Sequence, residues 1–126
     1  MPRAIAAVSK LKVALRGYAL AFPGAWLDHP WNEDHCKVGK KGFLSLSFAE
    51  GPETNPWMTM KLPESGAGVL MLACAKPAGY GLGKSGWVTF DLTQSDCPPR
   101  DVFQELIEES YRAVAPKTLV KELDAR

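Results

Sequence analysis

Apolar residues recur every three or four positions at the start of the chain, which is the pattern of a helix with one buried face. The stripe runs from Ile5 to Phe22, and a Pro-Gly pair follows it and ends the predicted helix. Lys12 and Arg16 fall off this stripe with most other basic residues of the segment. The pattern therefore predicts a solvent-facing basic side for this helix.

Residues 25–61 show strand signals in place of helical spacing. Four runs qualify as strands: "AWLDHPW", "HCKV", "FLSLSF" and "WMTMKL". The polar segment "NED" predicts the turn between the first two runs, and residues 39–42, "GKKG", predict the next. A meander of about four strands is therefore expected after the first helix.

The second half of the chain predicts two longer helices around one strand. Pro63 suits the first turn of a helix that would bury Val69, Leu70, Leu72 and Ala73, although Gly66 and Gly68 weaken it. A glycine-rich loop and the alternating strand "GWVTFDL" follow. Asp96 and two prolines predict the start of a third helix, with the inward positions Phe103, Leu106, Ile107, Ser110 and Val114. After Pro116, "KTLVKEL" predicts a short terminal helix.

Strands and helices do not alternate in this order, which argues against a doubly wound parallel sheet. The order predicts an α+β fold, a two-layer sandwich in which an antiparallel sheet carries its helices mainly on one face. With 126 residues and no break in composition, residues 1–126 are expected to form a single domain.

The composition argues against some classes of function but does not identify one. Hydrophobic residues make up 46% and charged residues 23%, and no apolar run reaches the length of a membrane span. A net charge of +1 gives no global attraction to nucleic acid, so any polyanion site must be a local patch. Cys36, Cys74 and Cys97 are odd in number and widely spaced. They predict reduced thiols and a cytoplasmic location, and the lack of a long apolar run predicts no membrane association.

The segment "PAGYGLGKSGWVTFDL" contains glycines spaced as in dinucleotide-binding loops and a Gly-Lys-Ser like that of a phosphate-binding loop. Both motifs need a strand before the glycines and a helix after them, because the helix N-terminus holds the phosphates. Here a helix is predicted before the loop and a strand after it. The glycines are therefore interpreted as a flexible connection, and no cofactor is expected.

Five segments carry a resemblance to a known family: "LAFPGAWLDHPW", "VGKKGFLSLSF", "MTMKLP", "PAGYGLGKSGWVTFDL" and "LIEESYRAVAPKTL". In this order they resemble the MmcQ/YjbR family of small bacterial proteins. Lys41 and Phe43 match its Lys-x-Phe, Lys61 the lysine before the second helix, and Tyr80 and Trp87 its loop and following strand. The loop is richer in glycine than the family pattern.

The resemblance implies a fold like that of secretion chaperones. It also implies DNA binding through a "double wing" arrangement, a function assigned to the family by structural analogy.

Lysines gather around the two predicted turns. Lys37, Lys40 and Lys41 surround the first, Lys76 and Lys84 flank the glycine-rich loop, and Lys61 ends a strand. If both turns project from one edge of the sheet, they form two basic wings for phosphates. Tyr80 and Trp87 are candidates for stacking or sugar contacts. The competing interpretation leaves these lysines solvated and places Trp87 and Phe43 in the core.

Three other functions remain open. His29, His35 and Cys36 lie close in sequence, but their spacing matches no standard zinc pattern, and no metal is expected. A protein-interaction or homodimer module is the alternative to DNA binding, with the strand of Trp57, Met58 and Met60 as its apolar surface. An enzyme is the least favoured class, because no catalytic constellation is evident.

Overall fold

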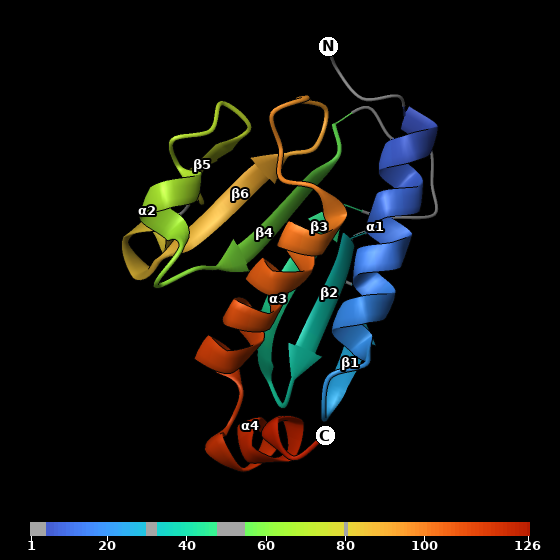
Figure 1. Cartoon of the computed structure of the whole chain (residues 1–126), viewed down its shortest axis with the longest axis vertical. Coiled ribbons are helices and arrows are strands. Elements are labelled where there is room, and N and C mark those ends of the chain that lie inside the picture. Colours follow the sequence, from blue (N-terminus) through green and yellow to red (C-terminus); the bar gives the residue numbers. More distant parts are fainter. Residues whose placement is uncertain (1–4, 30–32, 48–54, 80) are drawn as a thin grey trace.

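The computed structural model of the protein describes residues 5–29, 33–47, 55–79 and 81–126, with side chains from Ala7 onward. In chain order the elements are α1 (Ile5–Leu20), β1 (Ala25–Asp28), β2 (Glu33–Val38), β3 (Lys41–Ser47), β4 (Trp57–Lys61), α2 (Gly66–Val69), β5 (Ala75–Pro77), the 3-10 turn η2 (Leu82–Ser85), β6 (Trp87–Asp91), α3 (Arg100–Val114) and α4 (Lys117–Asp124). The strands form one antiparallel sheet in the order β1-β2-β3-β4-β6-β5 (Figure 1).

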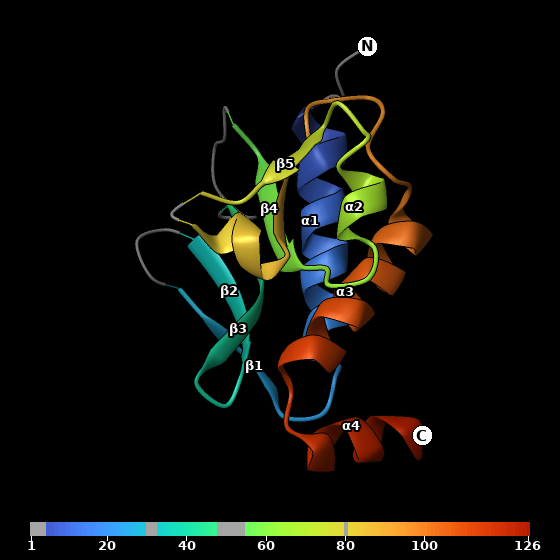
Figure 2. The ribbon, with the colours of Figure 1, turned by 90° about the vertical axis from the view of Figure 1, so that its left-hand side faces the viewer.

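The structure is the two-layer α+β sandwich that the sequence predicts. Helices α1, α2 and α3 lie on one side of the sheet, and none of the described α-helices covers the other side (Figure 2). Strands β4 and β6 alternate accordingly: Met58, Met60, Val88 and Phe90 are buried toward the helices. We call the opposite side the uncovered face. It carries Trp57, Thr59 and Lys61 on β4 and Trp87, Thr89 and Asp91 on β6.

The predicted meander and the strand after the glycine loop are confirmed, but several local predictions are wrong. Glu33 and Asp34 of the predicted "NED" turn already belong to β2, and Asn32 lies outside the described residues. The second helix is a single turn, α2, because Gly66 and Gly68 weaken it, and Leu70 is 38% exposed. Asp96 does not cap α3, since its carboxylate accepts the Ala73 N–H at 2.6 Å.

Lys10 of α1 is exposed as predicted, but Lys12 and Arg16 are not solvent-facing. Lys12 is fully buried, and its ammonium donates to the carbonyl oxygen of Ser47 at 3.1 Å and to the Ser47 hydroxyl at 2.9 Å. The Arg16 guanidinium donates to the buried carboxylate of Asp34 at 3.0 Å. Both side chains reach the sheet from α1, so they join the two layers instead of forming a surface patch.

None of the helices within the described residues combines the length and apolar character of a membrane span.

Two neighbouring residues of α3, Ser110 and Tyr111, connect this helix to the sheet and to the segment after α1. The Ser110 hydroxyl accepts the N–H of Lys61 at 2.9 Å and donates to the carbonyl oxygen of Phe43, so it bridges β4 and β3. The Tyr111 hydroxyl donates to the Pro23 carbonyl at 2.6 Å, and its ring stacks on Phe22 at a centroid distance of 4.7 Å. The sequence analysis predicted Ser110 as inward-facing and missed Tyr111, which is fully buried.

Substitution of Ser110 by alanine tests this bridge. Ser110→Ala leaves one backbone donor and one acceptor without their partner in the protein interior, and we expect the free energy of unfolding to fall by about 2 kcal/mol. Urea unfolding followed by tryptophan fluorescence measures the change. Ser85→Ala, at an exposed position of η2, is the control and should change nothing. An equally small effect of both substitutions would contradict the proposed bridge.

Candidate nucleic-acid interface

Strand direction places both predicted wings at one end of the sheet. Strand β2 runs toward the turn at Gly39 and Lys40, and β3 begins there. Strand β5 ends, and β6 begins, at the same end, where residues 78–86 connect them. We call these two connections the first tip (residues 37–41) and the second tip (residues 78–86). Strand β4 lies between them and ends with Lys61 at this same end.

At the first tip, Lys40 and Lys41 are exposed, whereas Lys37 is half-buried and paired. The Lys37 ammonium donates to Asp28 at 2.7 Å and lies 5.5 Å from the centroid of the Trp26 ring. The hydrogen bond from Lys37 lowers the pKa of the Asp28 carboxyl. The Trp26 indole N–H donates to the Gly39 carbonyl at 2.9 Å, so this side chain braces the turn.

A lysine that the sequence analysis did not select joins the first tip. Lys40, Lys41 and Lys117 line a cavity of about 460 Å³ together with apolar residues at the end of α3, and none of the described residues that line it is acidic. Lys117 is the first residue of α4, and the partial positive charge at the N-terminus of this helix also favours an anion.

Helix α4 is held in this position by contacts that link it to the end of α1. Gly24 has a φ of 70°, and a Cβ atom there would lie 2.9 Å from the Leu119 side chain, so the glycine makes room for α4. The Arg112 guanidinium of α3 donates to Asp124 of α4 at 2.8 Å. Arg126, just after α4, donates to the carbonyl of Ala21 at 2.8 Å and so links α4 to the end of α1.

Glycines shape the second tip. Gly81 and Gly86 flank η2 with φ angles of 78° and 88°, a conformation that favours glycine. Gly83 packs so closely that a Cβ atom would lie 2.6 Å from the Cβ of Pro77. The prediction of a helix directly before the loop is wrong, because β5 precedes it. Since β6 follows the loop and only the 3-10 turn η2 lies within it, the loop connects two antiparallel strands, and the helix that a nucleotide-binding loop needs is not there.

Of the remaining candidate residues, Lys61, Lys84 and Trp87 lie at this end of the sheet, whereas Lys76 lies opposite Thr89 in the middle of β6. Lys84 is exposed on η2, Lys76 is exposed on the edge strand β5, and Lys61 is half-buried opposite Trp87. The core interpretation is right for Phe43, which is fully buried, and wrong for Trp87, which is half-buried because the alternation of β6 turns it to the uncovered face. Tyr80 lies outside the described residues.

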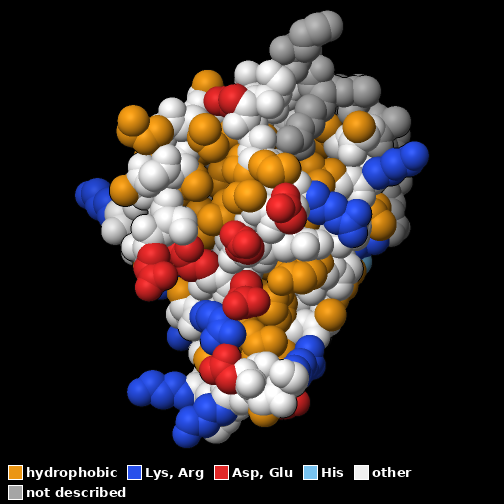
Figure 3. Space-filling view, viewed as in Figure 1, with side chains coloured by type: hydrophobic (Ala, Val, Ile, Leu, Met, Phe, Trp, Pro, Cys, Tyr) orange, Lys and Arg blue, Asp and Glu red, His pale blue; other side chains and the backbone are white. Residues whose placement is uncertain are grey.

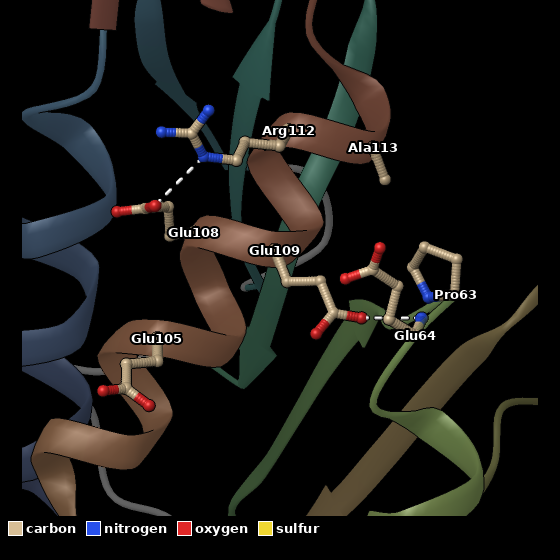
Figure 4. A pocket seen from close by; sticks show the side chains of 7 residues that line it. All are labelled: Pro63, Glu64, Glu105, Glu108, Glu109, Arg112 and Ala113. Atoms are coloured by element: carbon tan, nitrogen blue, oxygen red, sulfur yellow. Dashed lines mark hydrogen bonds and ion pairs between the residues drawn. The ribbon is translucent and has the colours of Figure 1, made fainter. Parts of the chain in front are cut away.

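The middle of the helix-covered side is acidic. A cavity of about 390 Å³ between α3 and the segment after β4 is lined by Glu64, Glu105, Glu108 and Glu109, with Arg112 as the one cation among its lining residues. Figure 4 shows the carboxylates around this cavity, with Glu108 bonded to Arg112 at 3.0 Å and Glu109 accepting the Glu64 N–H at 2.9 Å. In Figure 3, acidic side chains cross the middle of this side, and lysine and arginine side chains surround its lower end. Phosphates are therefore repelled from the middle of the helix-covered side.

Other candidate chemistry is dispersed. His29 Nδ1 lies 2.6 Å from the buried Asp34 carboxylate, and His35 Nε2 lies 2.9 Å from Glu33, so each histidine has its own carboxylate partner. Over the part of the chain that the structure describes, no group of three histidine, cysteine or acidic residues is placed to hold a metal ion. Burial raises the pKa of the Cys36 thiol to about 12, which makes it a poor nucleophile.

The predicted apolar interaction strand is wrong. Met58 and Met60 are fully buried under the helices, because the alternation of β4 turns both toward the core. Only Trp57 of that group reaches the uncovered face. The large apolar side chains exposed in the described structure lie elsewhere: Val13, Trp26, Leu70, Met71 and Leu82.

Fold and site together define a small α+β protein with exposed lysines at two hairpin tips on one end of an antiparallel sheet. A comparison with models of protein families matches residues 20–113 to the YjbR family. The match covers most of the chain, and the protein belongs to the YjbR family, as the sequence resemblance predicts. None of the curated proteins compared with the chain matches it.

The buried thiols predict a labelling pattern. At pH 8 a thiol with a pKa of about 12 is ionised to about one part in ten thousand, and Cys74 and Cys97 are also buried. We expect iodoacetamide to modify none of the three free cysteines in the folded protein within minutes and all of them in urea. Mass spectrometry counts the adducts. Rapid native labelling of Cys36 would contradict its inert environment.

The close packing of Gly83 predicts a second effect. Gly83→Ala forces a methyl group against Pro77, and we expect a loss of about 1–3 kcal/mol in unfolding free energy. Gly79→Ala is the matched control in the same loop, because nothing lies within 4 Å of its Cβ position. Thermal unfolding compares the two variants. Equal stability would show that the second tip tolerates a side chain at Gly83, against the observed packing.

Proposed function

We propose that this protein binds DNA non-enzymatically through phosphate contacts made by the lysines of its two hairpin tips. The observation that carries the proposal is the cavity at the first tip, where Lys40, Lys41 and Lys117 meet and the described lining residues include no carboxylate. Lys84 at the second tip and Lys61 between the tips extend this set along one end of the sheet. A row of cations is the arrangement that a phosphate backbone requires.

The charge distribution favours approach at the tip end of the molecule. The acidic cavity of Glu64, Glu105, Glu108 and Glu109 lies on the helix-covered side, so a polyanion meets repulsion there. With a net charge of +1, attraction depends on the tips themselves. Binding through so few lysines is weak at physiological salt and shows little preference for sequence.

The expected test is a titration of fluorescently labelled duplex DNA at two salt concentrations, about 0.05 and 0.15 M. The wild-type protein should bind at low salt and weaken as salt rises. Lys40→Ala/Lys41→Ala should weaken binding and lower the slope of log affinity against log salt by about 2, because each phosphate contact contributes about 0.9. Lys84→Ala should lower the slope by about 1 if the second tip contacts the same DNA.

A charge-matched variant controls for net charge. Lys10→Ala/Arg100→Ala also removes two cations, but from the exposed start of α1 and the first position of α3, away from both tips (Figure 1). It should leave the salt slope unchanged. No binding at low salt, or an equal loss in both double variants, would contradict the proposal.

A protein-interaction role is favoured by one separate observation. Met71, just after α2, is 87% exposed, and the neighbouring Leu70 is 38% exposed. Apolar side chains exposed to this degree next to each other are typical of contact surfaces. Size-exclusion chromatography of the protein and of Leu70→Ser/Met71→Ser tests this second candidate. A shift from a larger species to the monomer in the variant would support it, and a wild-type monomer with no partner would not.

A further inference from the structure

A third cavity lies on the uncovered face, at the end of the sheet opposite the two tips. It has a volume of about 370 Å³ and is lined by Asn55, Trp57, Lys76, Thr89, Asp91 and Thr93, among others. Trp57 and Asp91 are direct partners on β4 and β6, and Lys76 is the partner of Thr89 on β5. Three adjacent strands thus bring an indole, a carboxylate and an ammonium group together.

From this combination we infer that the cavity receives one base of a single-stranded nucleic acid, with the base against Trp57 and the adjoining phosphate at Lys76. The inference rests on the proposed binding of DNA and extends it to an unpaired segment of the strand. Proteins that bind single strands combine an aromatic platform for the bases with a cationic path for the backbone.

The carboxylate of Asp91 decides which part of the nucleic acid enters. Although burial acts to raise the pKa of Asp91, the hydrogen bonds from Thr93 and Gln94 and the charge of Lys76 hold it below its usual value. One oxygen accepts the Thr93 N–H at 3.0 Å and the Thr93 hydroxyl at 2.7 Å, and the other accepts the Gln94 amide at 3.3 Å. A carboxylate has about four acceptor positions, so the second oxygen retains one for a ligand.

An ionised carboxylate repels a phosphate and accepts a hydrogen bond from an amino group. Cytosine, adenine and guanine carry exocyclic amino groups, whereas thymine does not. The cavity therefore favours a base over a phosphate. It also favours an amino-bearing base over thymine, because thymine offers only the single N3–H of its ring where the amino group offers two protruding donors. Lys76, exposed at the edge of the sheet, is left for the phosphate.

The path between this cavity and the tips is continuous along β4. Trp57, Thr59 and Lys61 follow each other on the uncovered face over about 14 Å, at the strand rise of about 3.4 Å per residue. The Thr59 and Thr89 hydroxyls, 2.8 Å apart, lie midway. A single DNA strand whose phosphates are held at the tips can thus place a base against Trp57 without crossing the acidic middle of the helix-covered side.

The test uses the full chain with labelled oligodeoxycytidine, oligodeoxythymidine and a duplex of the same length. Oligodeoxycytidine should bind about tenfold more tightly than oligodeoxythymidine and quench tryptophan fluorescence. Asp91→Asn should remove the difference between the two single strands. Trp57→Leu should weaken both by about tenfold, since stacking contributes 1–3 kcal/mol per base by order of magnitude. Val13→Ala, at an exposed position of α1 on the helix-covered side, is the control and should keep the base preference.

The outcomes separate the two proposals, once thermal unfolding confirms that each variant is folded. If both single strands and the duplex bind equally, and Trp57→Leu and Asp91→Asn change nothing, the base site is wrong. DNA binding through the tips then still stands, provided that Lys40→Ala/Lys41→Ala weakens it. If the lysine substitutions have no effect while Trp57→Leu does, the base site stands and the two-tip proposal falls. If neither set has an effect, both fall.

Discussion

The contact of Ser110 with two strands is the constraint on which the arrangement of the molecule depends. Its hydroxyl takes the place of a direct ladder contact between Lys61 of β4 and Phe43 of β3, so the two strands are joined through α3 at this end of the sheet. Tyr111, the next residue, ties the same turn of α3 to Pro23 and stacks on Phe22. One helical turn therefore holds the end of α1, the first hairpin and the second half of the sheet, and all three are needed to place the lysines.

This arrangement explains why the two tips are separate. The first tip belongs to β2 and β3, and the second to β5 and β6, with β4 between them. Each tip has its own stabilising contacts: Trp26 to Gly39 at the first, and tight packing of Gly83 on Pro77 at the second. The two cationic elements are thus supported independently, and their relative position is set by the pairing of β3 with β4 together with the Ser110 bridge. The affinities of the two tips for one DNA molecule reinforce each other only as far as these contacts hold the tips in a fixed relative position.

How much the sequence predicts depends on whether a feature is local. Strand β6 follows from strict alternation, and its face assignment is right because a period of two leaves no freedom. The single turn of α2 and the strand β5 were mispredicted, because two glycines and a three-residue strand with a proline give almost no periodic signal. Lys12 and Lys117 could not be assigned, since their surroundings arise from the packing of α1 against Ser47 and of Leu119 against Gly24. Neither contact has a signature along the chain.

The segregation of charge has a consequence that the net charge hides. Carboxylates line a cavity in the middle of one side and lysines line another at the tip end, so a formal charge of +1 coexists with two local patches of opposite sign. A polyanion attracts the lysine patch and repels the acidic patch, so it favours one orientation of the protein before contact is made. Orientation is thus selected during the approach, and added salt shortens the distance over which that alignment begins.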